Sequence, residues 1–251
     1  MNVFVTGGSR GIGRQIVLRF AREGWGVAFT YAGNQAAADE TVALVEAAAR
    51  ESGNATPKIK GYKLDLRDRA GIEKTSEEVF AAFDEVHALV NNAAIVRNNA
   101  AVVMSDDEWD EVIAANLTGP FLLMRAFTMH FMSNRFGRIV NISSLAEGGC
   151  SGQANYAASK SGLMGLTQTF AKEYGPKGIT ANIVTVGYVP TDMTKDNMAE
   201  QLHQFWMKHC PVKRPGKGEE IADLVHFLCS ERGAFINGER IRVSGGLTYA
   251  P

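Results

Sequence analysis

Tyr156 and Lys160 stand four residues apart in the segment ANYAASKSG, residues 154–162. On a helix, residues at this spacing lie on one face, with their Cβ atoms about 5–6 Å apart. A free tyrosine has a pKa of about 10, and a neighbouring ammonium lowers it by favouring the phenolate. The pair therefore indicates either a general acid–base that interconverts a carbonyl and an alcohol, or an ordinary surface contact.

Three further polar stretches fall at or after predicted strands: NNAA (91–94), AANLTG (114–119) and ISS (142–144). In α/β sheets, ligands bind outside the carboxyl ends of the strands, so these stretches and the tyrosine segment are expected to meet there. A serine at the end of the strand 137–144 would hold and polarise a carbonyl oxygen. Asn116, on a helix, would anchor a water that links Lys160 to solvent.

Residues 6–13 read TGGSRGIG, with glycines at 7, 11 and 13 after the first strand and at the start of a helix. A tight turn of this kind lets the backbone approach a pyrophosphate at the positive end of the helix. A plain glycine turn is the alternative, but the strand-to-helix context favours dinucleotide binding.

The second predicted strand ends in FTYAGN and has no carboxylate from Phe29 to Asn34, where NAD-binding proteins often place one for the ribose. Arg10 lies within the glycine loop, and a guanidinium can pair with a 2′-phosphate. These two features favour NADP over NAD. Asp65, at the end of the third strand, either accepts from the adenine amino group or is a solvated turn residue.

Short β-rich runs alternate with helical patterns along the whole chain, which is typical of βαβ units. We predict one doubly wound α/β domain over residues 1–251, with a seven-stranded, mostly parallel sheet and helices on both faces. The predicted strands are 2–6, 26–31, the run ending near 64, ALVNNA, 137–144, 179–186 and 239–245. The stretch 192–217 is either a substrate lid or a helical excursion on the surface.

The bulk composition excludes several classes of protein. The net charge of −1 gives no reason to expect nucleic acid or an anionic membrane as a partner. No run approaches the roughly 18 apolar residues that span a bilayer, and the start of the chain does not read as a signal peptide. Three dispersed cysteines indicate free thiols in a reducing, cytoplasmic setting, and the five histidines show no metal-ligand spacing.

In their order and spacing, TGGSRGIG, NNAA, AANLTG, ISS and YAASK resemble the short-chain dehydrogenase/reductase family over nearly the whole chain. The resemblance implies a Rossmann-like domain, no metal, a homotetramer, and a catalytic tetrad of Ser144, Tyr156, Lys160 and Asn116. It also implies NADP(H) contacts at Gly7, Ser9, Arg10, Gly11, Ile12, Gly13, Asn34, Asp65, Leu66, Asn91, Ala93, Tyr156, Lys160, Val189 and Thr191.

The choice of serine depends on which element is counted. Counting along the strand gives Ser144, whereas counting back from Tyr156 gives Ser143. We take Ser144, because the strand decides which side chain faces the site while the following loop tolerates a deletion. Glu147 departs from the small residue usual there, and either selects a polar substrate or points to solvent. Cys150 is expected to be a small packing residue rather than a nucleophile.

Within the family, SRGIG, YAGN, GQANYAASKSG and GITANIV are most similar to 3-oxoacyl-(acyl-carrier-protein) reductases, which use NADPH. The resemblance implies reduction of a 3-oxoacyl thioester in fatty acid biosynthesis, with Arg135 and Lys177 docking the acidic carrier protein near the pocket mouth. The alternatives are another ketone or secondary alcohol as substrate (a diol, polyketide or steroid), and a non-catalytic NADP-binding sensor or scaffold.

Overall fold

The computed structural model of the chain describes residues 1–52, 55–191 and 200–248. Its centre is a seven-stranded sheet in the order β3-β2-β1-β4-β5-β6-β7. Every neighbouring pair of these strands is parallel, so the sheet is wholly parallel where a mostly parallel one was predicted. The strands are β1 Asn2–Val5, β2 Gly26–Tyr31, β3 Ile59–Lys63, β4 Ala88–Asn91, β5 Gly137–Ser144, β6 Ile179–Val186 and β7 Arg240–Val243.

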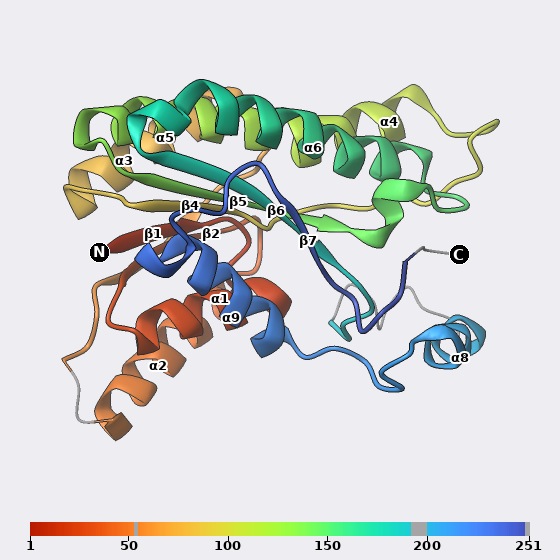
Figure 1. The fold of residues 1–251 in the computed structure, drawn as a ribbon, viewed down its shortest axis with the longest axis horizontal. Helices are drawn as coiled ribbons and strands as arrows, with labels where there is room; N and C mark the ends of the chain where they lie inside the picture. The colour runs from red at the N-terminus through yellow and green to blue at the C-terminus, as the bar shows by residue number, and fades with distance from the viewer. Residues whose placement is uncertain (53–54, 192–199, 249–251) are drawn as a thin grey trace.

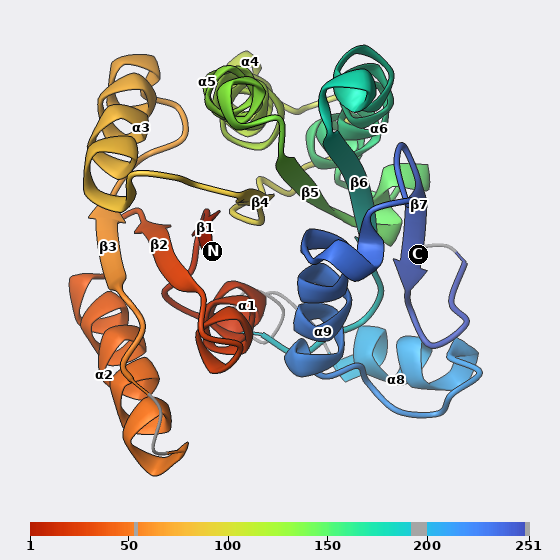
Figure 2. The ribbon, with the colours of Figure 1, turned by 60° about the vertical axis from the view of Figure 1, so that its left-hand side comes forward.

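Helices cover both faces of the sheet (Figures 1 and 2). One face carries α1 (Gly11–Arg22), α2 (Gln35–Ser52) and α9 (Gly218–Cys229), and the other carries α3 (Arg69–Phe83), α4 (Asp106–Ile113), α5 (Gly119–Asn134) and α6 (Ala154–Tyr174). Short helical turns are η1 (Ala114–Thr118), η2 (Leu145–Gly148), η3 (Gly175–Lys177) and η4 (Glu231–Gly233), and α8 spans Glu200–His209. The two layers give two separate apolar cores, one on each face.

The central strands are buried on both faces, which explains their near-continuous apolar sequences. Every residue of β2, β4 and β6 is buried. Phe4 of β1 packs toward α5, stacked on Phe127 with ring centroids 5.0 Å apart, while Val3 and Val5 point into the core beneath α1 and α9. This rigid sheet is the platform on which the loops at its carboxyl edge are held.

The longest helical run, Asp106–Asn134, joins α4, η1 and α5 and is long and apolar enough to cross a membrane by composition alone. Just over half of its most apolar window is buried inside the protein. Leu123, Phe127 and Phe131 are fully buried against the sheet and α3. Its apolar character therefore has an explanation in the packing of the core.

The order of the strands reverses at β1, which lies between β2 and β4. Chain connections leave the carboxyl ends of β1 and β4 toward opposite sides, and in open α/β sheets the resulting crevice is where ligands bind.

The predicted lid falls partly outside the described residues, since these omit 192–199. In the described part, α8 packs beside the end of β5 and the end of β6: Trp206 forms a small apolar cluster with Leu145, Cys210 and Leu247. The Tyr188 hydroxyl lies 2.9 Å from His203 Nδ1, which joins the loop after β6 to this helix. The helix thus lies next to Leu145, the residue that follows Ser144.

Candidate active site

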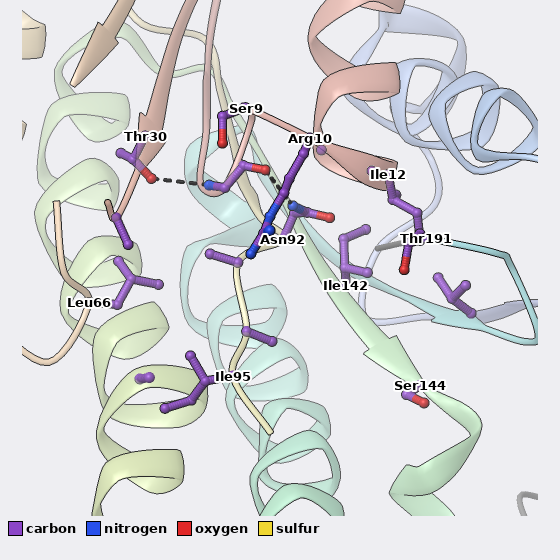
Figure 3. A pocket seen from close by; sticks show the side chains of 18 of the residues that line it. Ser9, Arg10, Ile12, Thr30, Leu66, Asn92, Ile95, Ile142, Ser144 and Thr191 are labelled. Atoms are coloured by element: carbon purple, nitrogen blue, oxygen red, sulfur yellow. Dashed lines mark hydrogen bonds between the residues drawn. The ribbon is translucent and has the colours of Figure 1, made fainter. Parts of the chain in front are cut away.

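A cavity of about 410 Å³ opens at the carboxyl edge of the sheet. Figure 3 shows side chains from several strand ends and loops turned toward it. Of the predicted site residues, its lining includes Gly7, Ser9, Arg10, Gly11, Ile12, Gly13, Asp65, Leu66, Ala93, Ser144, Tyr156, Lys160, Val189 and Thr191. Segments far apart in the sequence therefore meet at one elongated site.

The glycine loop has the shape that a pyrophosphate requires. Gly7 has φ +68°, and its N–H donates to Thr30 Oγ1 at 3.1 Å, which ties the loop to β2. A Cβ at Gly13 would lie 2.0 Å from the Gly7 carbonyl oxygen, so no side chain fits there. The loop passes directly into the first turn of α1, whose free N–H groups attract anions. These features fit the phosphates of a dinucleotide.

Arg10 lies at the junction of this cavity and a second one of about 440 Å³, which Asn34 also lines. Within the described residues its guanidinium has no hydrogen bond or ion pair. The neighbouring Arg14 is committed elsewhere, to the Ser9 carbonyl at 2.7 Å and to Glu40 at 2.7 Å. Arg10 is thus the arginine of this loop that is free to meet an anionic group.

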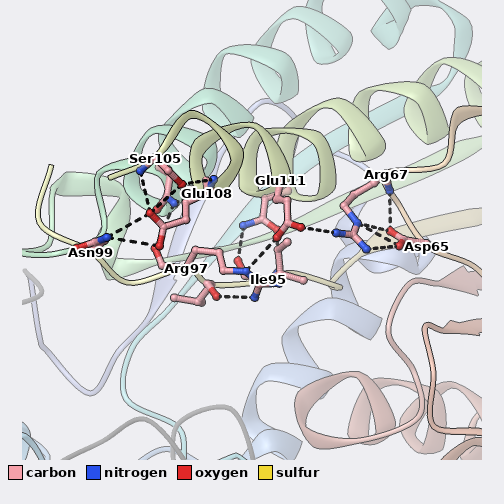
Figure 4. Close-up of polar contacts among 11 residues, drawn as sticks. Asp65, Arg67, Ile95, Arg97, Asn99, Ser105, Glu108 and Glu111 are labelled. Atoms are coloured by element: carbon pink, nitrogen blue, oxygen red, sulfur yellow. Dashed lines mark hydrogen bonds and ion pairs between the residues drawn. The ribbon is translucent and has the colours of Figure 1, made fainter. Parts of the chain in front are cut away.

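Asp65 lies in the cavity lining, as predicted for the adenine end of the site. Both oxygens of its carboxylate accept hydrogen bonds from Arg67, at 3.0 Å and 2.6 Å, and these bonds hold the pKa of Asp65 below its usual range. Arg67 also pairs with Glu111 of α4 at 2.9 Å (Figure 4). The carboxylate is therefore an anchor for Arg67, and Leu66 beside it lines the cavity.

Asn91 does not line the cavity, contrary to the prediction that it contacts the cofactor ribose. Its side-chain amide is turned away from the cavity and donates to Asn141 Oδ1 at 2.8 Å. Asn92 lines the cavity instead, and its amide donates to the Thr6 carbonyl at 2.9 Å. The reason is the two-residue alternation at the end of β4, which turns neighbouring side chains to opposite sides.

Tyr156 lies in the first turn of α6, with its N–H bonded to Asn155 Oδ1 at 2.7 Å. Burial raises the pKa of Tyr156 to about 12, and a hydrogen bond with the Ser144 side chain offsets part of this rise. We expected the neighbouring ammonium to lower the pKa below its ordinary value. That prediction is wrong for this structure, because burial dominates and the phenol keeps its proton.

Lys160 is 3% exposed, and its ammonium donates to the Ile142 carbonyl at 2.8 Å. The Nζ atom lies 5.6 Å from the centre of the Tyr156 ring, so the two side chains share one face of α6 as predicted. Burial lowers the pKa of Lys160 to about 8, while the negative charge of Glu147 raises it. Its charge is therefore sensitive to small changes around it.

Ser144, rather than Ser143, is the serine beside Tyr156. Its Oγ accepts from the Ala146 N–H at 3.2 Å. The Ser143 hydroxyl instead donates to Glu147 at 2.6 Å. Neighbouring residues on a strand face opposite ways, so the position of one serine determines that of the other.

Asn116 lies in η1, a π-helical turn between α4 and α5, and is fully buried. Its side chain bonds the Ile95 backbone in both directions, accepting from the N–H and donating to the carbonyl at 2.9 Å each. It therefore anchors the loop after β4. Single π-helical turns often mark functional sites, because they shift the backbone hydrogen-bond pattern.

Asn155, which the sequence analysis did not single out, also holds the loop after β4. Its amide donates to the carbonyls of Arg97 and Glu108 at 3.1 and 2.9 Å, and the side chain is fully buried. Figure 4 shows the adjacent bonds that Arg97 donates to Glu111, and that Asn99 and the Ser105 N–H donate to the Glu108 carboxylate. A polar residue directly before the tyrosine, at a helix start, was the available signal.

Arg135 and Lys177 do not lie at the pocket mouth of their own chain. Arg135 caps α5 before β5 begins, and Lys177 ends η3 before β6 begins. Both are thus at the amino edge of the sheet, whereas Ser144 is at the carboxyl end of β5, whose eight residues span about 23 Å. The two loops do lie together, since a Cβ at Gly178 would be 2.3 Å from the Arg135 carbonyl oxygen.

The chain is similar to known proteins over nearly its whole length. Residues 7–248 match the family model described as Enoyl-(Acyl carrier protein) reductase. The chain is 40% identical to the 3-oxoacyl-[acyl-carrier-protein] reductase FabG of Escherichia coli (strain K12), over 97% of this chain and 95% of that protein. The chain belongs to the short-chain dehydrogenase/reductase family. Membership accounts for the order of the glycine loop, the serine and the Tyr/Lys pair along the chain.

Other members of the family show the same extent of similarity. FabG of Aquifex aeolicus (strain VF5) is 39% identical over 97% of this chain and 95% of its own. The crystal structure of levodione reductase superposes with a TM-score of 0.92 at 28% identity, covering 98% and 96% of the two chains. A short-chain dehydrogenase from Burkholderia cenocepacia J2315, in complex with NADP, gives a TM-score of 0.87 at 33% identity, over 97% and 96%.

Proposed function

We propose that this enzyme reduces a 3-oxoacyl thioester to the 3-hydroxyacyl form with NADPH. The main support is the side-by-side placement of the Ser144 hydroxyl and the Tyr156 phenol, two groups that can donate to one carbonyl oxygen. The names of the FabG relatives at 37–40% identity supply the substrate class. The NADP complex of the Burkholderia relative supports the cofactor.

When bound, NADPH supplies the hydride. Ser144 orients and polarises the keto oxygen, and the phenol of Tyr156 gives it a proton. Lys160 holds the turn of α6 against β5 and binds the ribose beside Tyr156. A hydroxyl whose pKa is raised to about 12 retains its proton at neutral pH, which suits an acid that donates. Asn116 anchors the loop after β4, and a water held at η1 would return the proton from solvent.

Arg10 is the residue we propose for the 2′-phosphate, with Asn34 beside it at the second cavity. For the other cofactor contacts we propose the residues predicted from the sequence, with Asn92 in place of Asn91 because Asn92 lines the cavity.

The substrate is tested by comparing a 3-oxoacyl thioester with the corresponding 2-enoyl thioester, since the family model's description names an enoyl reductase. NADPH oxidation with the 3-oxoacyl form, and little or none with the enoyl form, is the expected result. Turnover of the enoyl form alone would contradict the proposal.

A second candidate substrate is a small ketone outside fatty acid metabolism. It is supported by the name of levodione reductase, a structural neighbour at 28% identity. A panel of small ketones assayed beside the thioesters separates the two, because each predicts a higher kcat/KM for its own class.

We propose an acyl-carrier protein as the partner that delivers the substrate. Because Arg135 and Lys177 lie at the far edge of the sheet, replacing either by alanine should leave kcat/KM for a small pantetheine-type thioester unchanged. A rise in KM confined to the carrier-protein substrate would show docking there. If the variants kept the wild-type KM for the carrier-protein substrate as well, these residues would not belong to the docking site.

We also propose a homotetramer that works in the cytoplasm. Exposed apolar side chains on or before α4 and α5, among them Val103, Trp109 and Met129, support association. Cys210 and Cys229 are buried free thiols, which supports a reducing compartment. Analytical ultracentrifugation tests the assembly.

The segment 192–217 remains our candidate lid, in keeping with the packing of α8 beside Leu145.

A further inference from the structure

The sequence left two alternatives for Glu147, which were that it selects a polar substrate or points to solvent, and the structure supports neither. Its side chain is only 7% exposed, so it does not point to solvent. It also does not line the 410 Å³ cavity, so it does not select a substrate there. It lies beside a separate cavity of about 130 Å³, together with Arg240 and Arg242.

The carboxylate of Glu147 joins three neighbouring strands. It accepts from Ser143 Oγ of β5 at 2.6 Å, from Thr185 Oγ1 of β6 at 3.0 Å, and from Arg240 of β7 at 3.3 Å. Ser143 and Thr185 are register partners, so their hydroxyls point to the same face of the sheet. A buried carboxylate with two hydroxyl donors and an arginine is well satisfied.

This cluster lies directly behind the reacting groups. Ser143 precedes Ser144 on β5, and its Oγ is 3.4 Å from the carbonyl oxygen of Lys160. The hydroxyl has one proton, and the shorter contact shows that Glu147 receives it. The turn η2, which begins at Leu145 and contains Glu147, is thereby bonded to β5.

We propose that Glu147 is a positioning residue of this reductase: it fixes the turn that presents Ser144, and its negative charge stabilises the ammonium of Lys160. The inference rests on the proposed function. It is supported by the finding that Glu147 raises the pKa of Lys160 against the effect of burial.

Besides Glu147, several charged or titratable groups surround this part of the site. Tyr156 shares α6 with Lys160, Cys150 acts on Tyr156, and Arg240 of β7 pairs with Glu147. The 410 Å³ cavity is also lined by Arg10, Asp65, Arg67 and Arg97. Asp65, the other carboxylate of this set, is 46% exposed and bound by Arg67. Glu147 is the buried anion of the group, and Arg240 is its cation.

Three variants separate charge from hydrogen bonding. Glu147→Gln removes the charge and keeps an acceptor, Arg240→Gln removes the opposing charge, and Ser143→Ala removes the hydroxyl and keeps the charge. Glu173→Gln, an exposed carboxylate on α6, is the matched control. For each variant we would measure the pH profile of kcat and, without substrate, the NMR titration of [ε-¹³C]lysine, assigned by the signal lost in Lys160→Arg.

We expect Glu147→Gln to lower kcat and to move the Lys160 titration and the alkaline limb of kcat to lower pH, by about one unit. Arg240→Gln should move both to higher pH. Ser143→Ala should lower kcat without moving either, and Glu173→Gln should change nothing. Should Glu147→Gln not fold, the other two variants carry the test.

Shifts of Glu147→Gln and Arg240→Gln in the same direction, or no shift in either, would overturn the inference. The NMR titration needs no substrate. Suppose that the wild type turned over no thioester, but that Glu147→Gln and Arg240→Gln shifted the Lys160 titration in opposite directions. The proposed substrate would then be wrong, while the role of Glu147 would stand.

Discussion

The Lys160 ammonium donates to the carbonyl oxygen of Ile142 at 2.8 Å, two residues before Ser144 on β5. This bond joins the strand that carries the serine to the helix that carries the tyrosine. Because both partners are buried, the bond is shielded from water and holds the two elements in register. The lysine thereby links the end of the strand that carries Ser144 to the helix that carries Tyr156.

Tyr156→Phe removes the phenolic hydroxyl and keeps the ring. We expect kcat to fall by about 10²–10⁴-fold, the usual contribution of a positioned acid, while the Kd for NADPH changes little. Stopped-flow turnover and fluorescence titration of NADPH measure the two quantities. Substantial turnover by the variant would mean that another group supplies the proton.

Ser144→Ala removes a hydroxyl that lies beside Tyr156. We expect a loss in kcat on the order of 10²-fold, typical for one donor to a developing oxyanion. The KM for substrate should change much less. If kcat were unchanged and KM rose instead, Ser144 would bind the ground state only.

The charge of Lys160 predicts the pH dependence of stability. Because the folded pKa of about 8 lies below its ordinary value, the unfolded chain binds more protons above pH 8. The free energy of unfolding should therefore gain a contribution that rises with pH from about 8 to 10, by at most about 1.4 kcal/mol per unit. Urea unfolding of wild type and Lys160→Met across this range measures it, and the variant should lack the rise.

Arg10→Ala should weaken NADPH binding by about tenfold or more and leave NADH binding nearly unchanged, since a 2′-phosphate is present only on NADPH. Arg22→Ala, an exposed arginine at the end of α1, is the control. Equal weakening for both cofactors would indicate that Arg10 contacts the shared pyrophosphate instead.

Asn155→Ala leaves the Arg97 and Glu108 carbonyls without their amide donor. We expect a loss of about 1–3 kcal/mol in the free energy of unfolding, the cost of buried unpaired groups. Differential scanning calorimetry would show this as a lower Tm. A stability equal to that of the wild type would mean that water replaces the amide at no cost.

Much of the site could be predicted because its residues follow strand ends. The glycine loop after β1 and the Tyr/Lys spacing on α6 depend on local periodicity, and the structure brings them together at one cavity. Ser144 was chosen over Ser143 from the strand, and the structure places it beside Tyr156.

The remaining differences come from long-range packing. The direction of Asn91 depends on the side chain of Asn141, fifty residues away, and that of Glu147 on Arg240, ninety-three residues away. The pKa of Tyr156 is governed by burial, which a spacing rule does not report. Arg135 and Lys177 each precede a strand, which already placed them at its amino end.

In the proposed reaction, hydride from NADPH reaches the keto carbon while Tyr156 protonates the oxygen. The most direct measurement is mass spectrometry of the product formed from NADPH that carries deuterium at both C4 positions and a 3-oxoacyl thioester, by wild type and by Tyr156→Phe. We predict a 3-hydroxyacyl product with deuterium at the hydroxyl-bearing carbon, and almost none from the variant. A saturated acyl product, or deuterium absent from that carbon, would contradict the account.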